Sequence, residues 1–252
     1  MQNLNRKKGI FVEINKKLFD MKKLVILSGA GVSKESGIST FRDNGGLWEK
    51  YDIEDVASIN GWYKDSKLVL EFYNTRRREL KDVEPNTAHQ LIATLEESFD
   101  VTVITQNVDN LHERAGSSKI IHLHGELTKA RGEHSEKPVI DIGYNDIKPG
   151  DKNEKGEQIR PYIVWFGEAV PMIPVAAEIV SQADILLIIG TSMNVYPAAG
   201  LVNYAPVGIP IYLIDPEPIR LNIPNFQQIR SVATKGMEEF VLILKNRYLS
   251  IH

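Results

Sequence analysis

Polar side chains follow four apolar stretches of the chain, at the point where each stretch ends. The four sets are Gln106, Asn107, Val108 and Asp109; His124; Gly190, Thr191 and Ser192; and Asp215, Pro216 and Glu217. A single polar residue at such a point is usually a turn former, but four sets that meet at one edge of a sheet are typical of a binding site. The sequence therefore predicts one site that gathers an imidazole, hydroxyls, amides and carboxylates.

These side-chain types fit a nucleotide. The hydroxyls of Thr191 and Ser192 can donate to phosphate oxygens, and Asp215 can accept from ribose hydroxyls. The imidazole of His124 titrates near neutral pH, so it can take a proton from a hydroxyl group. We expect a nucleotide site with a base beside it.

A glycine-rich stretch, SGAGVSKESG, follows the first apolar run. A strand that breaks into such glycines lets backbone N–H groups approach a phosphate at a helix N-terminus. The dinucleotide pattern G-x-G-x-x-G is not met, because Lys34 stands where the third glycine should be. Gly29, Gly31 and Gly190 can allow close approach of the backbone, and Arg42 can neutralise a pyrophosphate.

Apolar runs typical of buried strands alternate with helical patterns along the chain. The predicted strands are residues 24–27, 101–105, 119–123, 185–189, 209–214 and 229–233. The predicted helices include residues 87–97, 175–182 and 237–248, the last with Phe240, Leu242 and Leu244 facing inward. This alternation predicts an α/β fold, a Rossmann-like open parallel sheet with helices on both faces, whose ligands lie at the carboxyl ends of the strands.

Two regions interrupt the alternation. Residues 46–85 are helical, and residues 127–161 are polar and rich in Gly, Lys and Asp. We expect them to form a small insert subdomain beside a large part made of residues 21–45, 86–126 and 162–252. Both parts belong to one domain, residues 21–252, and residues 1–20 are an N-terminal extension.

Composition excludes several classes of protein. The formal net charge is −3, which gives no sign of a nucleic-acid or membrane partner. No apolar run reaches the roughly 18 residues that a membrane span needs, and residues 1–20 lack the apolar core of a signal peptide. The chain has no cysteine, which excludes disulfides, thiolate catalysis and cysteine-bound zinc. These features predict a cytoplasmic protein.

The segments GAGVSKESGISTFRDNGGLW, TQNVDNLHERAG, HLHGEL, VWFGE and GTSMNVYPAAG occur in this order and resemble the sirtuins, NAD-dependent protein-lysine deacylases. The resemblance runs from about Lys22 to Leu244. It implies that the acyl group of an acyl-lysine passes to the ribose of NAD with release of nicotinamide, and that water then frees the lysine and O-acyl-ADP-ribose. NAD is the implied cofactor, acyl-lysine proteins or peptides are the implied partners, and no metal takes part in the chemistry.

The resemblance also assigns site residues. His124 is the implied base, and Asn107 and Asp109 are the other implied catalytic residues, at the nicotinamide end. The implied NAD-binding residues are Gly29, Ala30, Gly31, Ser33, Ile38, Phe41, Arg42, Trp48, Gln106, Asn107, Val108, Asp109, Gly190, Thr191, Ser192, Asp215, Pro216, Glu217 and Ala233. The residues expected to pair with the substrate backbone as an added strand are Val164, Trp165, Phe166, Gly167 and Glu168, opposite Asn194 and Tyr196.

Three further histidines lie near these motifs. His122 stands two positions before His124, so in a continuous strand both side chains would project from the same face. The Leu-His-Gly order of the family selects His124. We expect His89 and His112 to be structural.

Two features depart from the sirtuin pattern. Sirtuins usually hold zinc with four cysteines in the small subdomain, and Gly132 stands where the first is expected; Asp215 stands where the family often has Asn. Four residues offer metal ligands without a tetrahedral spacing, namely Glu133, His134, Glu136 and Asp141. We therefore expect no metal. The insert should instead be held by the packing of Val139, Ile140, Ile142 and Tyr144.

The stretch FYNTRRR places Tyr73 and Arg76 three residues apart, on one face of a predicted helix. From composition alone, an amphipathic helix with a solvated run of arginines is the simpler interpretation. The Y-x-x-R order resembles the sirtuin branch that accepts acidic acyl groups, in which Tyr and Arg bind the distal carboxylate of succinyl- or malonyl-lysine. Such a pair discriminates, because a neutral acyl group leaves a buried guanidinium without its partner.

Two alternatives to a deacylase stay open. One is an NAD glycohydrolase or ADP-ribosyltransferase on the same site, and the other is an idle NAD- or acyl-lysine-binding module. Intact VWFGE and Y-x-x-R segments favour deacylation, and the presence of Asn107, Asp109 and His124 argues against an idle module. We expect a monomer that removes acetyl, succinyl and malonyl groups.

Overall fold

The computed structural model describes residues 21–39, 51–219 and 223–249. The predictions for residues 1–20 and for Phe41, Arg42 and Trp48 lie outside these residues.

Six parallel strands form the main sheet, in the order β3-β2-β1-β7-β8-β9. They are β1 (Lys23–Ser28), β2 (Asp100–Thr105), β3 (Ile120–His122), β7 (Ile185–Ile189), β8 (Ile211–Ile214) and β9 (Phe226–Ile229). β1 lies near the centre, where Leu24 is opposite Val101 on one side and Ile185 on the other. All five residues of β7 are buried, as is typical of a parallel sheet that is covered on both faces.

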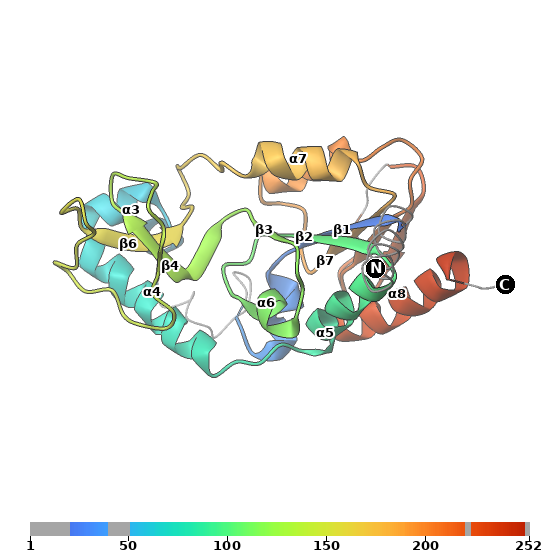
Figure 1. Ribbon diagram of the computed structural model, residues 1–252, viewed down its shortest axis with the longest axis horizontal. Coiled ribbons are helices and arrows are strands. Elements are labelled where there is room, and N and C mark those ends of the chain that lie inside the picture. Colours follow the sequence, from blue (N-terminus) through green and yellow to red (C-terminus); the bar gives the residue numbers. More distant parts are fainter. Residues whose placement is uncertain (1–20, 40–50, 220–222, 250–252) are drawn as a thin grey trace, which may run out of the picture.

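Helices cover both faces of this sheet (Figure 1). They are α5 (Thr87–Thr94), α7 (Ile173–Ser181), the 3₁₀ helix η5 (Ala198–Tyr204) and α8 (Ala233–Tyr248). α5 and α8 pack against the face that Leu24 and Ile26 present, and α7 and η5 pack against the face of Val25 and Leu27. Neighbouring residues of a strand point to opposite faces, so one apolar run supplies both cores. The predicted α/β fold is confirmed.

A smaller, antiparallel sheet with the order β5-β4-β6 lies at one end of the molecule, beside the helices α3 and α4 (Figure 1). Its elements are β4 (Gly125–Gly132), β5 (Ile140–Asp141), β6 (Ile159–Ile163), α2 (Ile53–Val56), α3 (Ile59–Lys64) and α4 (Ser66–Lys81). A third apolar core, which includes Trp62, Phe72 and Trp165, holds them together. The segments predicted to leave the main sheet do so, and the domain boundaries themselves stay a prediction.

Short helical turns connect these elements. They are η1 (Ala30–Val32), η2 (Lys34–Ser36), η4 (Leu95–Glu97) and α6 (Leu111–Ala115). η1 and η2 directly follow β1, so the glycine-rich stretch forms two 3₁₀ turns at the carboxyl end of the central strand.

Three predictions of detail are wrong. The strand predicted at residues 229–233 ends at Ile229, because Ala233 already begins α8. β8 begins only at Ile211, and the preceding Pro210 has no N–H to donate to a ladder. Leu242 is 60% exposed whereas Phe240 and Leu244 are fully buried, because residues four apart share a helix face and the residue midway between them does not.

The insert depends on polar pairs as well as on apolar packing. Ile142 and Tyr144 pack against the third core as predicted, but Val139 is exposed. Arg160 is buried and donates from both terminal nitrogens to the Glu168 carboxylate at 2.8 Å. The guanidinium of Arg160 also lies 3.4 Å from the centre of the Trp165 ring. A buried ion pair that stacks on an aromatic ring thus ties β6 to the segment that follows it.

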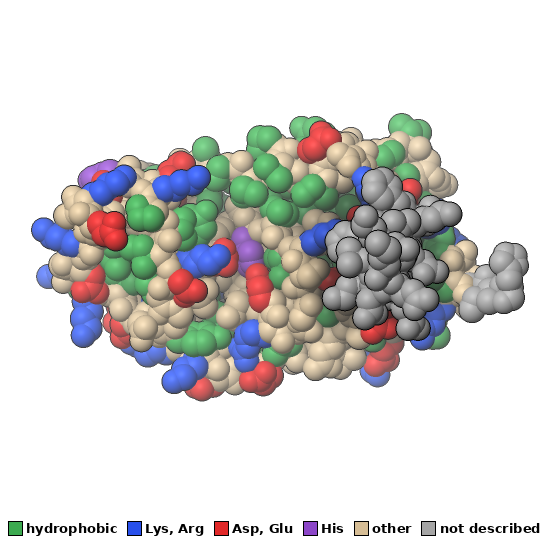
Figure 2. Space-filling model, in the orientation of Figure 1, with side chains coloured by type: hydrophobic (Ala, Val, Ile, Leu, Met, Phe, Trp, Pro, Cys, Tyr) green, Lys and Arg blue, Asp and Glu red, His purple; other side chains and the backbone are tan. Residues whose placement is uncertain are grey.

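Within the described residues, no helix is both long and apolar enough to cross a membrane. Figure 2 shows charged side chains of both signs interspersed over one face of the molecule.

Candidate functional site

A cavity of about 890 Å³ lies at the carboxyl ends of the parallel strands and reaches α4. Gly29, Gln106, Gly190 and Asp215, which follow β1, β2, β7 and β8, all line it. Of the predicted site residues that the structure describes, Asn194 is the one that does not line the cavity. Asn194 is exposed, and its neighbours Val195 and Tyr196 form the wall instead.

The glycines of the site pack the ends of β1 and β7 against each other. A Cβ atom on Gly31 would lie 2.7 Å from the Cα of Gly190, and one on Gly29 would lie 2.8 Å from the Gly190 carbonyl oxygen. Gly190 has a φ of +63°, a conformation that strains other residues. Gly29 N–H donates to Ile189 and Gly31 N–H donates to Gly190, so these two donors hold the loop to β7. These glycines therefore form the part of the cavity lining where β1 and β7 end.

A buried hydrogen-bond network lies where the nicotinamide end was predicted. The Asn107 side-chain amide donates to Ser33 Oγ at 3.1 Å, and Ser33 Oγ donates to Asp109 Oδ2 at 3.0 Å. The Leu111 N–H donates to the other oxygen of Asp109. Burial raises the pKa of Asp109, and the bonds from Leu111 and Ser33 oppose this only in part. The network fixes an amide and a carboxyl group that is easier to protonate than usual.

His124 lines the cavity with one ring nitrogen already used. Nδ1 lies 3.1 Å from the carbonyl oxygen of Gln106, and because a carbonyl only accepts, Nδ1 is the donor. Burial lowers the pKa of His124, with the Gln106 bond opposing it. A neutral ring then carries its lone pair on Nε2, which is the form that a general base needs.

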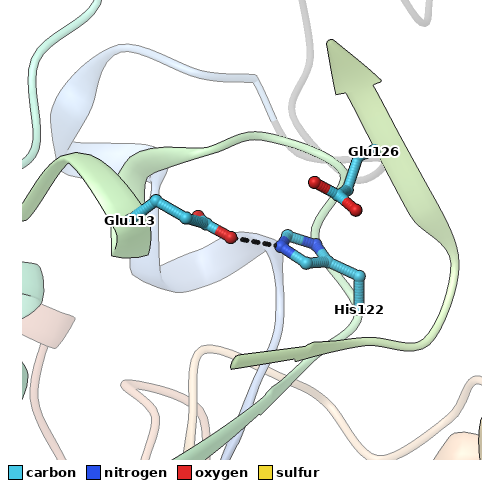
Figure 3. Close-up of side chains that lie close together, drawn as sticks. All are labelled: Glu113, His122 and Glu126. Carbon is cyan, nitrogen blue, oxygen red and sulfur yellow. Dashed lines mark hydrogen bonds and ion pairs between the residues drawn. The ribbon is translucent and has the colours of Figure 1, made fainter. Parts of the chain in front are cut away.

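The other three histidines have different surroundings. β3 ends at His122, so the alternation of a strand does not extend to His124, and His122 turns toward Glu113 (Figure 3). His89 and His112 are buried, lie with their ring centres 5.0 Å apart, and bond to Ser33 and Ser28. Burial lowers the pKa of both rings, His89 to about 4.

The three consecutive arginines of α4 go to three different places. Arg76 lines the cavity, and its guanidinium lies 5.7 Å from the centre of the Phe72 ring and 5.9 Å from that of Tyr73. Arg77 is buried and donates to the backbone of Leu127, whereas Arg78 is exposed and pairs with Glu71. The simpler interpretation, one solvated arginine face, is therefore wrong for Arg77, whereas Arg76 is partly buried and lines the cavity.

Tyr73 is buried beside Arg76. Its hydroxyl accepts a hydrogen bond from Trp165 Nε1 at 3.0 Å and keeps its own proton to donate. Burial raises the pKa of Tyr73 to about 12, so the hydroxyl stays protonated. Burial lowers the pKa of Arg76, which Tyr73, Asp109 and Glu79 partly oppose.

All residues of the segment 164–168 line the cavity. Val164 N–H donates to the His124 carbonyl, and Phe166 exchanges backbone bonds with Ala57 and Ile59. Phe166 is 51% exposed, and Tyr196, which also lines the cavity, is 74% exposed. Glu168 points inward to Arg160, although the sequence placed it against substrate.

Sequence reasoning missed the apolar wall beside Arg76. It is formed by Ile53, Ala57, Leu80, Val83 and Leu127. One signal was available, because Tyr73, Arg76 and Leu80 follow the spacing of a single helix face.

Ligand atoms of Glu113, His122 and Glu126 lie within 4.8 Å of one another (Figure 3). Glu113 is bonded to His122 and Glu126 pairs with Lys129 at 2.8 Å, so both carboxylates have partners within the protein. The four insert residues considered as metal ligands form no such group in the described part of the chain, and Glu133 accepts from Trp62.

The fold and the cavity define a Rossmann-like α/β protein with a nucleotide-type site at the carboxyl ends of its strands. The sequence model of the Sir2 family matches residues 29–197, and the chain belongs to that family.

Relatives and solved structures agree with this assignment. The chain is 54% identical over 230 residues to an NAD-dependent protein deacylase of Bacteroides thetaiotaomicron, over 89% of this chain and 98% of the relative. It is 52% identical over 222 residues to an NAD-dependent protein deacylase of Helicobacter pylori, over 88% and 96% of the two chains. The crystal structure of a Sir2 homologue in complex with NAD is 38% identical and superposes with a TM-score of 0.80 over 93% of each chain.

Proposed function

We infer that this chain is an NAD-dependent protein deacylase, and we propose that it removes succinyl and malonyl groups as well as acetyl groups from lysine side chains. The observation that supports this best is the continuity of one cavity, which runs from the glycine loop past His124 to Tyr73 and Arg76. A protein that only bound or hydrolysed NAD would have no use for the arm that ends at α4.

The cavity suits NAD in size and in chemistry. Its volume is within the roughly 300–1,000 Å³ typical of ligand sites. The glycines have no side chain, so a ligand in the cavity can approach their backbone closely. We propose that the glycine loop holds the pyrophosphate, that Asp215 binds ribose hydroxyls, and that Asn107 and Asp109 hold the nicotinamide end. When bound, NAD supplies an electrophilic ribose carbon and a hydroxyl group that can accept the acyl group.

The residues of the chain then have separate tasks. His124 takes a proton from a ribose hydroxyl through Nε2, since Nδ1 is fixed to Gln106. The bond from Ser33 to Asp109 and the bond from Asn107 to Ser33 keep both side chains in one orientation before the substrates bind. Such preorganisation favours reaction because the groups need no rearrangement during it.

Tyr73 and Arg76 would select the acyl group. Arg76 offers a charged donor fork among the apolar side chains that line this part of the cavity, and Tyr73 offers a protonated hydroxyl beside it. A carboxylate at the end of an acyl chain can accept from both, whereas an acetyl group is too short and has no charge to offer.

The acyl-lysine peptide would enter between the two walls at the mouth. We propose that it pairs as an added strand between residues 164–168 and residues 194–196, next to the exposed rings of Phe166 and Tyr196. The monomeric state, the cytoplasmic location and the lack of a nucleic-acid or membrane partner stay predictions.

Mass spectrometry of the products tests the proposed function. The purified protein is incubated with NAD and one peptide in three forms, acetyl-, succinyl- and malonyl-lysine. We expect free lysine peptide, nicotinamide and O-acyl-ADP-ribose, with the acidic acyl groups removed at least as efficiently as acetyl. Free ADP-ribose with an intact acyl peptide would identify an NAD glycohydrolase, and ADP-ribose attached to protein would identify a transferase.

A further inference from the structure

His122 and His124 hold two consecutive carbonyl groups of the loop that follows β2. Nδ1 of His124 donates to the carbonyl of Gln106, and Nδ1 of His122 lies at the same distance, 3.1 Å, from the carbonyl of Asn107. The two rings differ at the other nitrogen. The ring of His124 lines the cavity and has its Nδ1 alone bonded to the loop. In His122, Nε2 is engaged as well, because it lies 2.6 Å from Glu113 Oε1 (Figure 3).

His122 therefore has an acceptor at each ring nitrogen. A carbonyl and a carboxylate both need an N–H, and a neutral imidazole carries only one. The imidazolium ion carries two, so it is the form that satisfies both partners. The short distance to Glu113 is typical of a charge-assisted bond, and the His122 side chain is only 9% exposed.

The groups that face His122 come from three elements. α6 contributes Glu113 and His112, and β4 contributes Glu126 with its partner Lys129. Burial lowers the pKa of His122, but the bond to Glu113 and the charges of Glu113 and Glu126 outweigh it, and the pKa is raised above its ordinary value. The loop after β2 contributes Asp109, whose charge also bears on the ring, and His124 is the remaining titratable neighbour along the chain. Opposite shifts in two neighbouring histidines mark different tasks.

We propose that His122 is a positioning residue: its imidazolium ties the carbonyl of Asn107 to the carboxylate of Glu113, and so holds Asn107 and Asp109 in place. This inference rests on the proposed role of those two residues at the nicotinamide end. When His122 loses a proton, one of its two bonds must break. The charge-assisted bond to Glu113 is the stronger, so the tie to Asn107 is the one released.

The pH dependence of catalysis follows from this. The protein is active while His122 is charged, and kcat/KM falls on the alkaline side as pH rises through its raised pKa. The fall levels off, because a displaced loop reduces catalysis by up to about 100-fold without abolishing it. The exchange of labelled nicotinamide into NAD reports the release of nicotinamide, which precedes the step of His124. The rate of this exchange should fall over the same pH range as kcat/KM.

Glu113→Gln gives the sharpest test. Its amide can donate to Nε2 while the neutral ring still donates from Nδ1 to Asn107, so both bonds survive without the extra proton. We expect the alkaline fall of the wild-type protein to disappear in Glu113→Gln, measured on whichever acyl peptide is turned over best. Glu126→Gln is the matched control, because Glu126 bonds to Lys129 and not to His122. Glu126→Gln should retain the alkaline fall of kcat/KM. The fall should move to slightly lower pH, because the charge of Glu126 raises the pKa of His122.

His122→Phe provides a second measurement. It should lower both deacylation and nicotinamide exchange by about 10- to 100-fold at neutral pH, whereas His124→Ala should lower deacylation and keep exchange. A wild-type profile without an alkaline fall, or the same fall in Glu113→Gln, would overturn the inference while deacylation still supports the proposed function. Stoichiometric zinc that is lost in both Glu113→Gln and Glu126→Gln would show a metal site in its place. If the wild-type protein turns over no acyl peptide, the proposed function fails and this inference fails with it.

Discussion

His124 differs from the buried histidines His89 and His112 in what each ring nitrogen meets. Its Nδ1 is tied to Gln106 and its ring lines the cavity, whereas His89 and His112 do not line it and bond to Ser33 and Ser28. His124→Ala should therefore retain fold and NAD binding but lower deacylation by about 10²- to 10⁴-fold, as expected when a general base is lost. Steady-state kinetics and NAD titration check this. His134→Ala changes an exposed histidine of the insert, so it is the control and should behave as wild type. Near-normal turnover by His124→Ala would contradict the assignment of His124 as the general base.

The acid side of the pH profile belongs to the same residue. Burial lowers the pKa of His124 from its ordinary 6.5, so the neutral base persists below that value. Activity that needs the neutral ring is present above the lowered pKa and is lost as pH falls through it. The acid inflection of kcat/KM should accordingly lie below 6.5, in a profile recorded at constant ionic strength. An inflection above 6.5 would contradict the assignment; one that moves in Asp109→Asn would show that the two groups titrate together.

At the scale of elements, sequence patterns predicted best where one physical effect decides the outcome. β7 and β1 are buried on both faces, so hydrophobicity alone identifies them, and the site residues that follow them were predicted with them. β9 was placed too late in the sequence because its two middle residues, Gln227 and Gln228, are polar, as an edge strand permits. Nothing local in the sequence shows that Arg160 and Glu168 pair or that Gly31 packs on Gly190, since these contacts depend on how distant segments meet.

The buried pair of Arg160 and Glu168 should be the most sensitive polar contact of the insert. Glu168→Gln removes the counter-charge of the buried Arg160 and also that of Arg131, which together costs about 3 kcal/mol of unfolding free energy. Denaturant titration measures it. Glu71→Gln breaks the exposed pair with Arg78 and should cost less than about 1 kcal/mol. Equal losses in the two variants would mean that the Arg160 pair is solvated in solution.

We expect the insert to be stable without a metal. A Cβ atom at position 132, where a cysteine was expected, would meet the Asn153 amide and the Glu157 carboxylate, so these side chains would have to move to make room for it. Those two side chains bond to each other at 3.0 Å and close the turn that precedes β6. A strong chelator should change neither the melting temperature nor deacylation. Elemental analysis that finds one zinc per chain would show that this expectation is wrong.

At the scale of the whole molecule, the proposed acyl selectivity depends on two parts of the fold that line one cavity. The six-stranded sheet contributes the nucleotide cradle and His124, and α4 contributes Tyr73 and Arg76. Neither part holds both the reacting groups and the selecting groups. Glu79 also lines the cavity and its charge bears on Arg76, so under the proposed acyl preference a substrate carboxylate competes with the carboxylate of Glu79. Removing that competitor in Glu79→Gln should favour acidic acyl groups.

Arg76→Met tests the selection directly. It should weaken transition-state binding of succinyl- and malonyl-lysine by about 2–5 kcal/mol, because their carboxylate is desolvated without its partner. Acetyl-lysine turnover should survive or rise, since the arm becomes apolar and no longer strands a charge. Tyr73→Phe should shift the preference the same way by about 0.5–1.5 kcal/mol, the loss of one neutral hydrogen bond. Ratios of kcat/KM between acyl groups are the measurement.

Arg78→Met is the matched control for that series, because Arg78 belongs to the same arginine run but is exposed and pairs with Glu71 and Asp146. It should leave every ratio unchanged. Tyr73→Phe also removes the acceptor of the Trp165 N–H, so its melting temperature must be compared before its kinetics are interpreted. A substitution that only loosens the cavity would lower turnover of all three acyl groups together. Equal losses in Arg76→Met would therefore place Arg76 in folding or peptide docking, whereas a loss confined to acidic acyl groups requires its guanidinium to meet the carboxylate.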